Sequence, residues 1–194
     1  MPDNTFDISG GQNQILPNAT KAEQNFYASS TPTRMSTYFQ DLLDEIRGEI
    51  KDEVIDELLW YTTKMDGTKD MEEKLTDGGF RQRTIQEAKL YKQMYAKKAM
   101  QYDCYPSAQK IILFLFARIK HEFDTSITPL IEQQQPLSIV MFKVREMIVI
   151  PIMELIEANG THDRHLNFTE DHIYGMIYYL TGMCHLNWKD YDNV

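Results

Sequence analysis

The chain has 194 residues, a net charge of −9 and two cysteines, and 42% of its residues are hydrophobic. This length fits one globular domain, the acidic charge argues against direct nucleic-acid binding, which needs a clustered basic surface, and two cysteines exclude a disulfide framework. The longest apolar runs, such as 111–117 and 147–152, are far shorter than the roughly 20 residues that cross a bilayer. Because no secretory pattern opens the sequence, we expect a cytoplasmic protein without a membrane span.

Residues 1–32 are predicted to form a polar leader. They are rich in Asn, Gln, Ser, Thr and Gly, and their few apolar residues bury too little surface to fold alone. The segment from Phe6 to Ile15 has strand character around Gly10 and Gly11, of the kind that pairs with the sheet edge of a partner. We therefore expect a flexible, disordered leader or a β-type tether, followed by a single helical domain over 33–194.

A long amphipathic helix is predicted from Thr33 to Lys64. Its apolar residues recur every three or four positions opposite a row of carboxylates, which is the pattern of a solvated helix face. Because this length exceeds that of an average globular helix, we expect a break near Gly48 or an arm that leaves the body. The segments 66–68 and 77–79 are then expected to bound a polar linker.

Two further helices are predicted on either side of Pro106. The first covers 82–102 and ends there, because proline disfavours helical geometry in the residue before it and cannot donate the helical hydrogen bond. The second covers 107–123 and is so apolar that we expect it at the centre of the domain.

The last third of the chain adds two more predicted helices. After a connector at 125–136, in which Pro129 fits the first turn of a short helix, a helix over 137–158 is expected to kink at Pro151. Thr169 is expected to cap the final helix. No alternating strand pattern appears in the body, so we predict an all-α fold, a helical bundle of about five helices.

The charges divide into two arms. Between Arg34 and Asp77 there are 13 acidic and 6 basic residues, a net of −7, whereas 81–98 carries six basic residues and a single acidic one, Glu87. One hypothesis is therefore a structural protein that forms homo-oligomers by pairing these arms, or that pairs them within one chain.

The sequence also permits a metal-dependent or thiol enzyme. His162 and His165 have a spacing that zinc can use, and Cys184 could complete a site, but a helix of about 15 residues would separate them by about 20 Å. Cys184 and His185 are adjacent, so on a helix their side chains point about 100° apart and do not face each other. No phosphate-binding glycine loop occurs. We therefore expect no catalytic residue, metal or cofactor, and keep the enzyme as the alternative.

The segment Thr169–Trp188, with the leader segment Ile8–Ala19, resembles the carboxyl-terminal domains of bacterial ABC-three-component conflict systems. In that family such helical domains are usually fused behind an effector and work beside an ABC or SMC-like ATPase in defence against phage. The resemblance implies that a set of motif residues shapes the core and one recognition surface. These residues are Tyr174, Gly175, Leu180, Gly182, Cys184, His185 and Trp188.

The resemblance also implies a function. Because no enzymatic module precedes the helical domain in this sequence, we expect a stand-alone, non-enzymatic adaptor that couples an ATPase or sensor to an effector encoded nearby. Its partners would be proteins, namely the effector, the ABC or SMC-like ATPase, or both. A high content of methionine, 11 residues, fits a surface that meets another protein.

Overall fold

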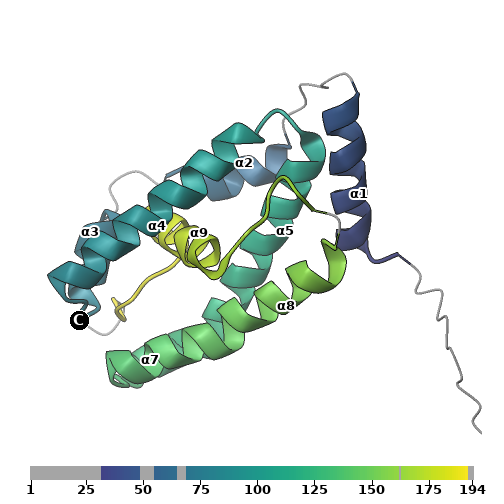
Figure 1. Cartoon of the computed structure of the whole chain (residues 1–194). Coiled ribbons are helices and arrows are strands. Elements are labelled where there is room, and N and C mark those ends of the chain that lie inside the picture. The colour runs from purple at the N-terminus through teal and green to yellow at the C-terminus, as the bar shows by residue number, and fades with distance from the viewer. Residues whose placement is uncertain (1–31, 49–54, 65–68, 162, 192–194) are drawn as a thin grey trace, which may run out of the picture. The chain divides into compact units, whose positions relative to one another are not determined.

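The computed structural model describes residues 32–48, 55–64, 69–161 and 163–191, which form helices joined by loops (Figure 1). No strand occurs among these residues, and the all-α prediction is confirmed. The predicted leader lies outside the described residues except for Pro32, so its order and its strand-prone segment remain predictions.

The helices follow one another with short connections. Two of them run without interruption through a π-helical segment, so α5, η1 and α6 form one continuous helix, as do α7, η2 and α8. The described part of the chain therefore contains seven continuous helices, against about five predicted. The elements are α1 (Arg34–Arg47), α2 (Asp56–Thr62), α3 (Met71–Asp77), α4 (Gln82–Gln101), α5 (Pro106–Glu122), η1 (Phe123–Ile127), α6 (Thr128–Glu132), α7 (Leu137–Val144), η2 (Arg145–Val149), α8 (Ile150–Asn159) and α9 (Glu170–Gly182).

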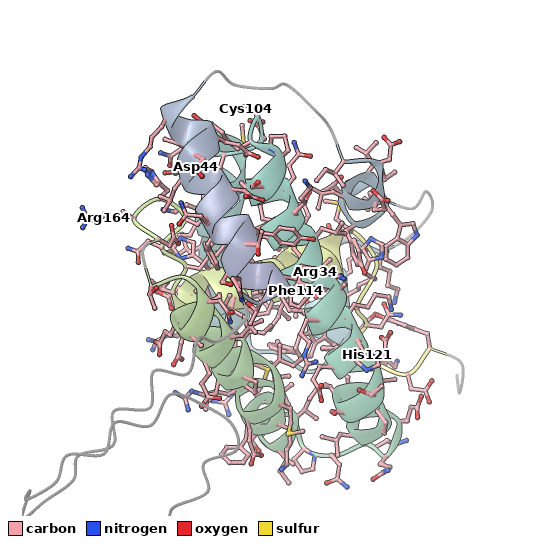
Figure 2. All side chains as sticks on the ribbon, turned by 90° about the vertical axis from the view of Figure 1, so that its right-hand side faces the viewer. Arg34, Asp44, Cys104, Phe114, His121 and Arg164 are labelled. Carbon is pink, nitrogen blue, oxygen red and sulfur yellow. The ribbon has the colours of Figure 1, made fainter. Side chains whose placement is uncertain are left out.

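The predicted break near Gly48 is present, because α1 ends there and α2 is a separate helix. Helix α1 lies along α5 (Figure 2) and buries Met35, Phe39 and Leu42 at helical spacing. Its acidic face is not wholly solvated. The carboxylate of Glu45 accepts hydrogen bonds from the backbone N–H and the hydroxyl of Ser107, at 3.0 and 2.6 Å, and so caps the amino end of α5.

The prediction of a polar linker between α2 and α4 is partly wrong, because α3 lies within it. Asp70 and Glu73 form a capping box: each carboxylate accepts the backbone N–H of the other residue at 2.9 Å. Met71 and Leu75 are buried, so this short helix belongs to the core. Among the described residues, one ion pair joins the two charge arms here, between Lys89 and Glu72 at 2.5 Å.

The irregularity expected at Pro151 lies one turn earlier, in η2. The N–H of Ile150 bonds to the carbonyl of Arg145, five residues back, instead of four. Pro151 follows directly in the first turn of α8, so the π-helical turn stands next to the one residue there that cannot donate a helical hydrogen bond. Pro129 likewise lies in the first turn of α6, but the predicted connector over 125–136 is partly wrong, because the helix that begins at Pro106 continues through η1 and α6 to Glu132.

Helix α9 crosses α4 at very short range in the middle of the domain (Figure 1). The crossing depends on Gly175, because a Cβ built there would lie 2.3 Å from the carbonyl oxygen of Tyr91 on α4. Leu180 on the same helix is fully buried. None of the described helices is long and apolar enough to cross a membrane.

Candidate partner-binding pocket

The tryptophan of the carboxyl-terminal motif is a core residue. Trp188 is 4% exposed, and its indole N–H donates to the hydroxyl of Thr181 at 3.0 Å. The rings of Phe80 and Phe123 meet it edge to face, with centroids 4.9 and 5.1 Å away. Trp188 therefore ties the chain that follows α9 back onto the body.

Two other motif residues lie on the α4 side of α9. Tyr174 is half-buried and its ring stacks on that of Tyr91, with centroids 6.2 Å apart. Gly182 is buried, and a Cβ there would lie 2.9 Å from the Nζ of Lys92. Burial lowers the pKa of Lys92. This part of the motif shapes the contact between α4 and α9.

Cys184 and His185 face different parts of the domain. Cys184 has a left-handed backbone, φ 71°, in the turn that ends α9, and its Sγ lies 3.6 Å from the carbonyl oxygen of Lys69. The thiol also interacts with the buried Lys74, whose pKa is lowered by burial. His185 instead packs on the rings of Trp60 and Tyr61 of α2, with centroid distances of 4.4 and 5.3 Å.

The described residues of the alternative zinc site, His165, Cys184 and His185, are not brought together. His162 lies outside the described residues. His165 packs against Tyr102, with ring centroids 6.3 Å apart, whereas Cys184 and His185 follow the far end of α9. Among the described residues, no group of three His, Cys, Asp or Glu side chains could hold a metal ion.

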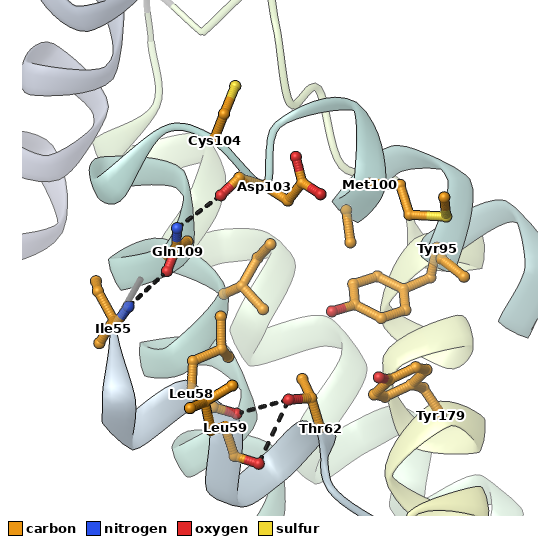
Figure 3. Close-up of a pocket in the computed structure, with 13 residues that line it drawn as sticks. Ile55, Leu58, Leu59, Thr62, Tyr95, Met100, Asp103, Cys104, Gln109 and Tyr179 are labelled. Atoms are coloured by element: carbon orange, nitrogen blue, oxygen red, sulfur yellow. Dashed lines mark hydrogen bonds between the residues drawn. The ribbon is translucent and has the colours of Figure 1, made fainter. Parts of the chain in front are cut away.

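An open pocket of about 470 Å³ lies between α2, α4, α5 and α9 (Figure 3). Helix α2 forms one wall, the second half of α4 and Tyr179 of α9 form the other, and α5 forms the floor. The lining is mainly apolar. Its larger side chains are Leu58, Leu59, Tyr95, Met100, Ile112 and Tyr179.

A glutamine bridge fixes one side of the pocket (Figure 3). The side-chain oxygen of Gln109 accepts the backbone N–H of Ile55 at 2.8 Å, and its NH₂ group donates to the backbone carbonyl of Asp103 at 2.6 Å. The amide thereby holds the start of α2 and the loop after α4 against α5. The pocket therefore has a fixed wall at this side before anything binds.

Two tyrosine hydroxyls point into the pocket (Figure 3). Tyr95 is 2% exposed, and its ring meets that of Tyr179 edge to face at a centroid distance of 5.3 Å. Neither hydroxyl makes a hydrogen bond to another residue of the described chain. Burial raises the pKa of both phenols, so both stay protonated at neutral pH and can donate a hydrogen bond.

The mouth of the pocket carries large apolar side chains. Met100 is 72% exposed and Leu59 is 48% exposed. Exposed apolar side chains that cluster at the rim of a cavity are a feature of interaction sites. Among the described residues of the lining, Asp103 alone is charged.

Tyr95 and Met100 lie on the helix predicted over 82–102, but the sequence did not indicate the pocket. The available signal was the excess of apolar residues on the second half of that helix, more than one buried face needs. Leu58 and Leu59 carried a similar signal, because adjacent positions cannot both face the same core. Tyr179, which forms part of the opposite wall, lies within the segment that resembles the family but was not among the residues named there.

Residues 70–188 match the family model of C-terminal domain 9 (CTD9) of the ABC-three component (ABC-3C) systems. The chain belongs to this family. The match begins at the capping residue of α3 and ends at Trp188, so it confirms the resemblance that the carboxyl-terminal motif indicated. No curated protein and no solved structure matches the chain.

The residues matched by the CTD9 model include only part of the pocket lining. The walls from α4, α5 and α9 lie within the matched residues, including Tyr95 and Tyr179. The wall from α2, with Leu58 and Leu59, lies before them. The site thus combines a surface from the CTD9 region with a surface from outside it.

Proposed function

We propose that this CTD9 domain is a non-enzymatic adaptor in the cytoplasm that binds a protein of its ABC-three-component system through the pocket. In this role it would couple the ATPase or sensor component to the effector. The observation that supports the proposal best is the open, mostly apolar pocket with exposed Met100 and Leu59 at its mouth. Membership in a family named for multi-protein systems supports protein partners.

The shape of the site suits a protein better than a reaction. Apolar walls with a few convergent polar groups provide affinity and orientation for an inserted side chain. Met100 adds a flexible, polarisable side chain that adapts to a partner surface. The groups that could serve catalysis, Cys184 and His185, lie outside the pocket lining.

The test is a co-purification of the tagged chain, expressed together with the proteins encoded beside its gene. Met100→Asp places a charge at the mouth of the pocket, and Leu90→Asp is its matched control. Both residues lie on α4, and both are mainly exposed, at 72% and 59%, but Leu90 does not line the pocket. Both variants should fold, which melting temperatures would check.

We expect Met100→Asp to reduce recovery of the partner at least ten-fold and Leu90→Asp to leave it unchanged. Equal recovery with both variants would place the interface elsewhere and refute the role of the pocket. Failure of the wild-type chain to retain any component would argue against the adaptor function itself. Stoichiometric zinc in the purified protein would favour the metal enzyme instead.

A further inference from the structure

We propose that the pocket receives an apolar anchor residue with a hydrogen-bonding tip, on a partner segment that carries Lys or Arg beside the anchor. This inference rests on the proposed function and adds the chemistry of the partner. Three observations on different parts of the pocket support it: the apolar walls, the two tyrosine hydroxyls, and the lone carboxylate.

The walls of the pocket favour an anchor residue with a large apolar side chain. Leu58 and Leu59 lie across the open space from the rings of Tyr95 and Tyr179 (Figure 3), and Ile112 also lines the pocket. A volume of about 470 Å³ falls in the range of roughly 300 to 1,000 Å³ that is usual for pockets which bury a ligand. It therefore admits a large side chain together with part of its neighbour.

The two tyrosine hydroxyls favour an anchor side chain that ends in a hydrogen-bonding group. Tyr95 and Tyr179 present two hydroxyls that bond to no described residue and that water in the open pocket can reach. An inserted group with a donor or acceptor at its end would satisfy both. A purely aliphatic anchor would instead remove any water from them and leave them unpaired.

The carboxylate selects a positive charge. Asp103 is exposed at the pocket, forms no ion pair within the described chain, and has no Lys or Arg beside it in the lining. It also lies two residues after the end of α4, where the helix dipole adds negative potential. A cationic residue next to the anchor would meet this potential, and an acidic one would be repelled.

Three blocked tetrapeptides test these choices by ¹H–¹⁵N NMR titration of the full chain. The first has the sequence lysine, leucine, tyrosine, lysine. The second replaces both lysines by glutamates, and the third replaces the tyrosine by phenylalanine. We expect the first to bind most tightly, the glutamate peptide at least five-fold more weakly, and the phenylalanine peptide about two- to five-fold more weakly.

Two conservative variants assign each preference to its residue. Asp103→Asn should abolish the preference for lysine and leave the preference for tyrosine, whereas Tyr95→Phe should reduce the preference for tyrosine, with the hydroxyl of Tyr179 still present, and leave the preference for lysine. Tyr95→Phe removes a hydroxyl that makes no hydrogen bond to the described chain, so its melting temperature should equal that of the wild type.

The inference is wrong if the three peptides bind equally, if none binds at millimolar concentration, or if the preferences survive in the variants. These outcomes are separate from those of the co-purification. If Met100→Asp loses the partner while the peptides show no preference, the pocket is the interface and the proposed anchor chemistry is wrong.

Discussion

The substitution Gly175→Ala tests whether α9 and α4 are held together by backbone contact. A Cβ at residue 175 would lie 2.3 Å from the carbonyl oxygen and 2.9 Å from the carbonyl carbon of Tyr91. Real Cβ contacts do not fall below 3.0 Å, so the helices must separate by about 0.7 Å. Backbone atoms cannot rotate away as a side chain does, so we expect the cost at the upper end of overpacking, about 3 kcal/mol.

Part of that cost is offset, because alanine is favoured over glycine within a helix by about 0.5 to 1 kcal/mol. The net loss in the free energy of unfolding should be about 2 kcal/mol. For a domain of this size, that loss corresponds to a fall in melting temperature of about 4 to 8 °C. Urea unfolding followed by circular dichroism, with a thermal scan, measures both quantities.

Gly182→Ala is the matched control on the same helix. Its Cβ would meet the Nζ of Lys92 at 2.9 Å, and this is the end of a flexible side chain that can move aside. We expect a change of less than about 1 kcal/mol, because small adjustments of a long side chain are less costly than those of packed backbone. Equal effects of the two substitutions would refute the argument.

The same substitution should also disturb the pocket. Tyr95 and Tyr179 lie on the two helices that Gly175 holds together, and a Cβ at 175 would lie 2.7 Å from the Cβ of Tyr95. We expect Gly175→Ala to weaken peptide binding, whereas Gly182→Ala should leave it unchanged. Unaltered binding by a destabilised Gly175→Ala protein would show that the pocket does not depend on this crossing.

Three other predictions concern the core, a helix cap and pH. Trp188→Ala should lower the free energy of unfolding, measured in urea, by about 3 to 5 kcal/mol, because it leaves a cavity in a buried aromatic cluster. A loss below about 1 kcal/mol would place Trp188 on a surface instead. Asp70→Ala should cost about 1 kcal/mol by removing the cap of α3, with Asp70→Asn costing less; equal costs would argue against the capping role. Burial lowers the pKa of His185, so the unfolded chain takes up a proton more readily than the folded chain, and stability should fall as pH drops through about 6.5. The melting temperature of His185→Gln should therefore fall less between pH 7.5 and pH 5 than that of the wild type. An identical fall in both proteins would contradict the role of His185.

Local signals gave several helix ends, because single residues decide them, but they missed that the helix from Pro106 continues to Glu132 instead of ending at 123. Gly48 ends α1, Pro106 occupies the first turn of α5, and Thr169 precedes α9, where its backbone N–H bonds to His172. The missed helix α3 had an equally local signal. Asp70 and Glu73 have the spacing of a capping box before a short apolar pattern, but the glycines on both sides favoured a linker.

The pocket was beyond sequence reasoning because it is formed by four helices that are distant in the chain. Leu58 and Tyr179 become neighbours only through the packing of α2 and α9 onto α5 and α4. The composition and the helical periodicity of the sequence show which residues are apolar, but they do not show which apolar side chains stay exposed in the folded domain. The same limit applies to Lys74, whose burial results from its tertiary contacts with the turn after α9.

Helix α2 buries none of its residues completely, yet it supplies an entire wall of the pocket and lies before the CTD9 match. Substitutions at Leu58, Leu59 or Thr62 can therefore change what the pocket accepts without emptying the core. On the proposed function, part of the partner choice is thus encoded in α2, outside the residues that the core buries completely. Related systems could diverge in specificity by exchanging one short helix while the rest of the domain is preserved.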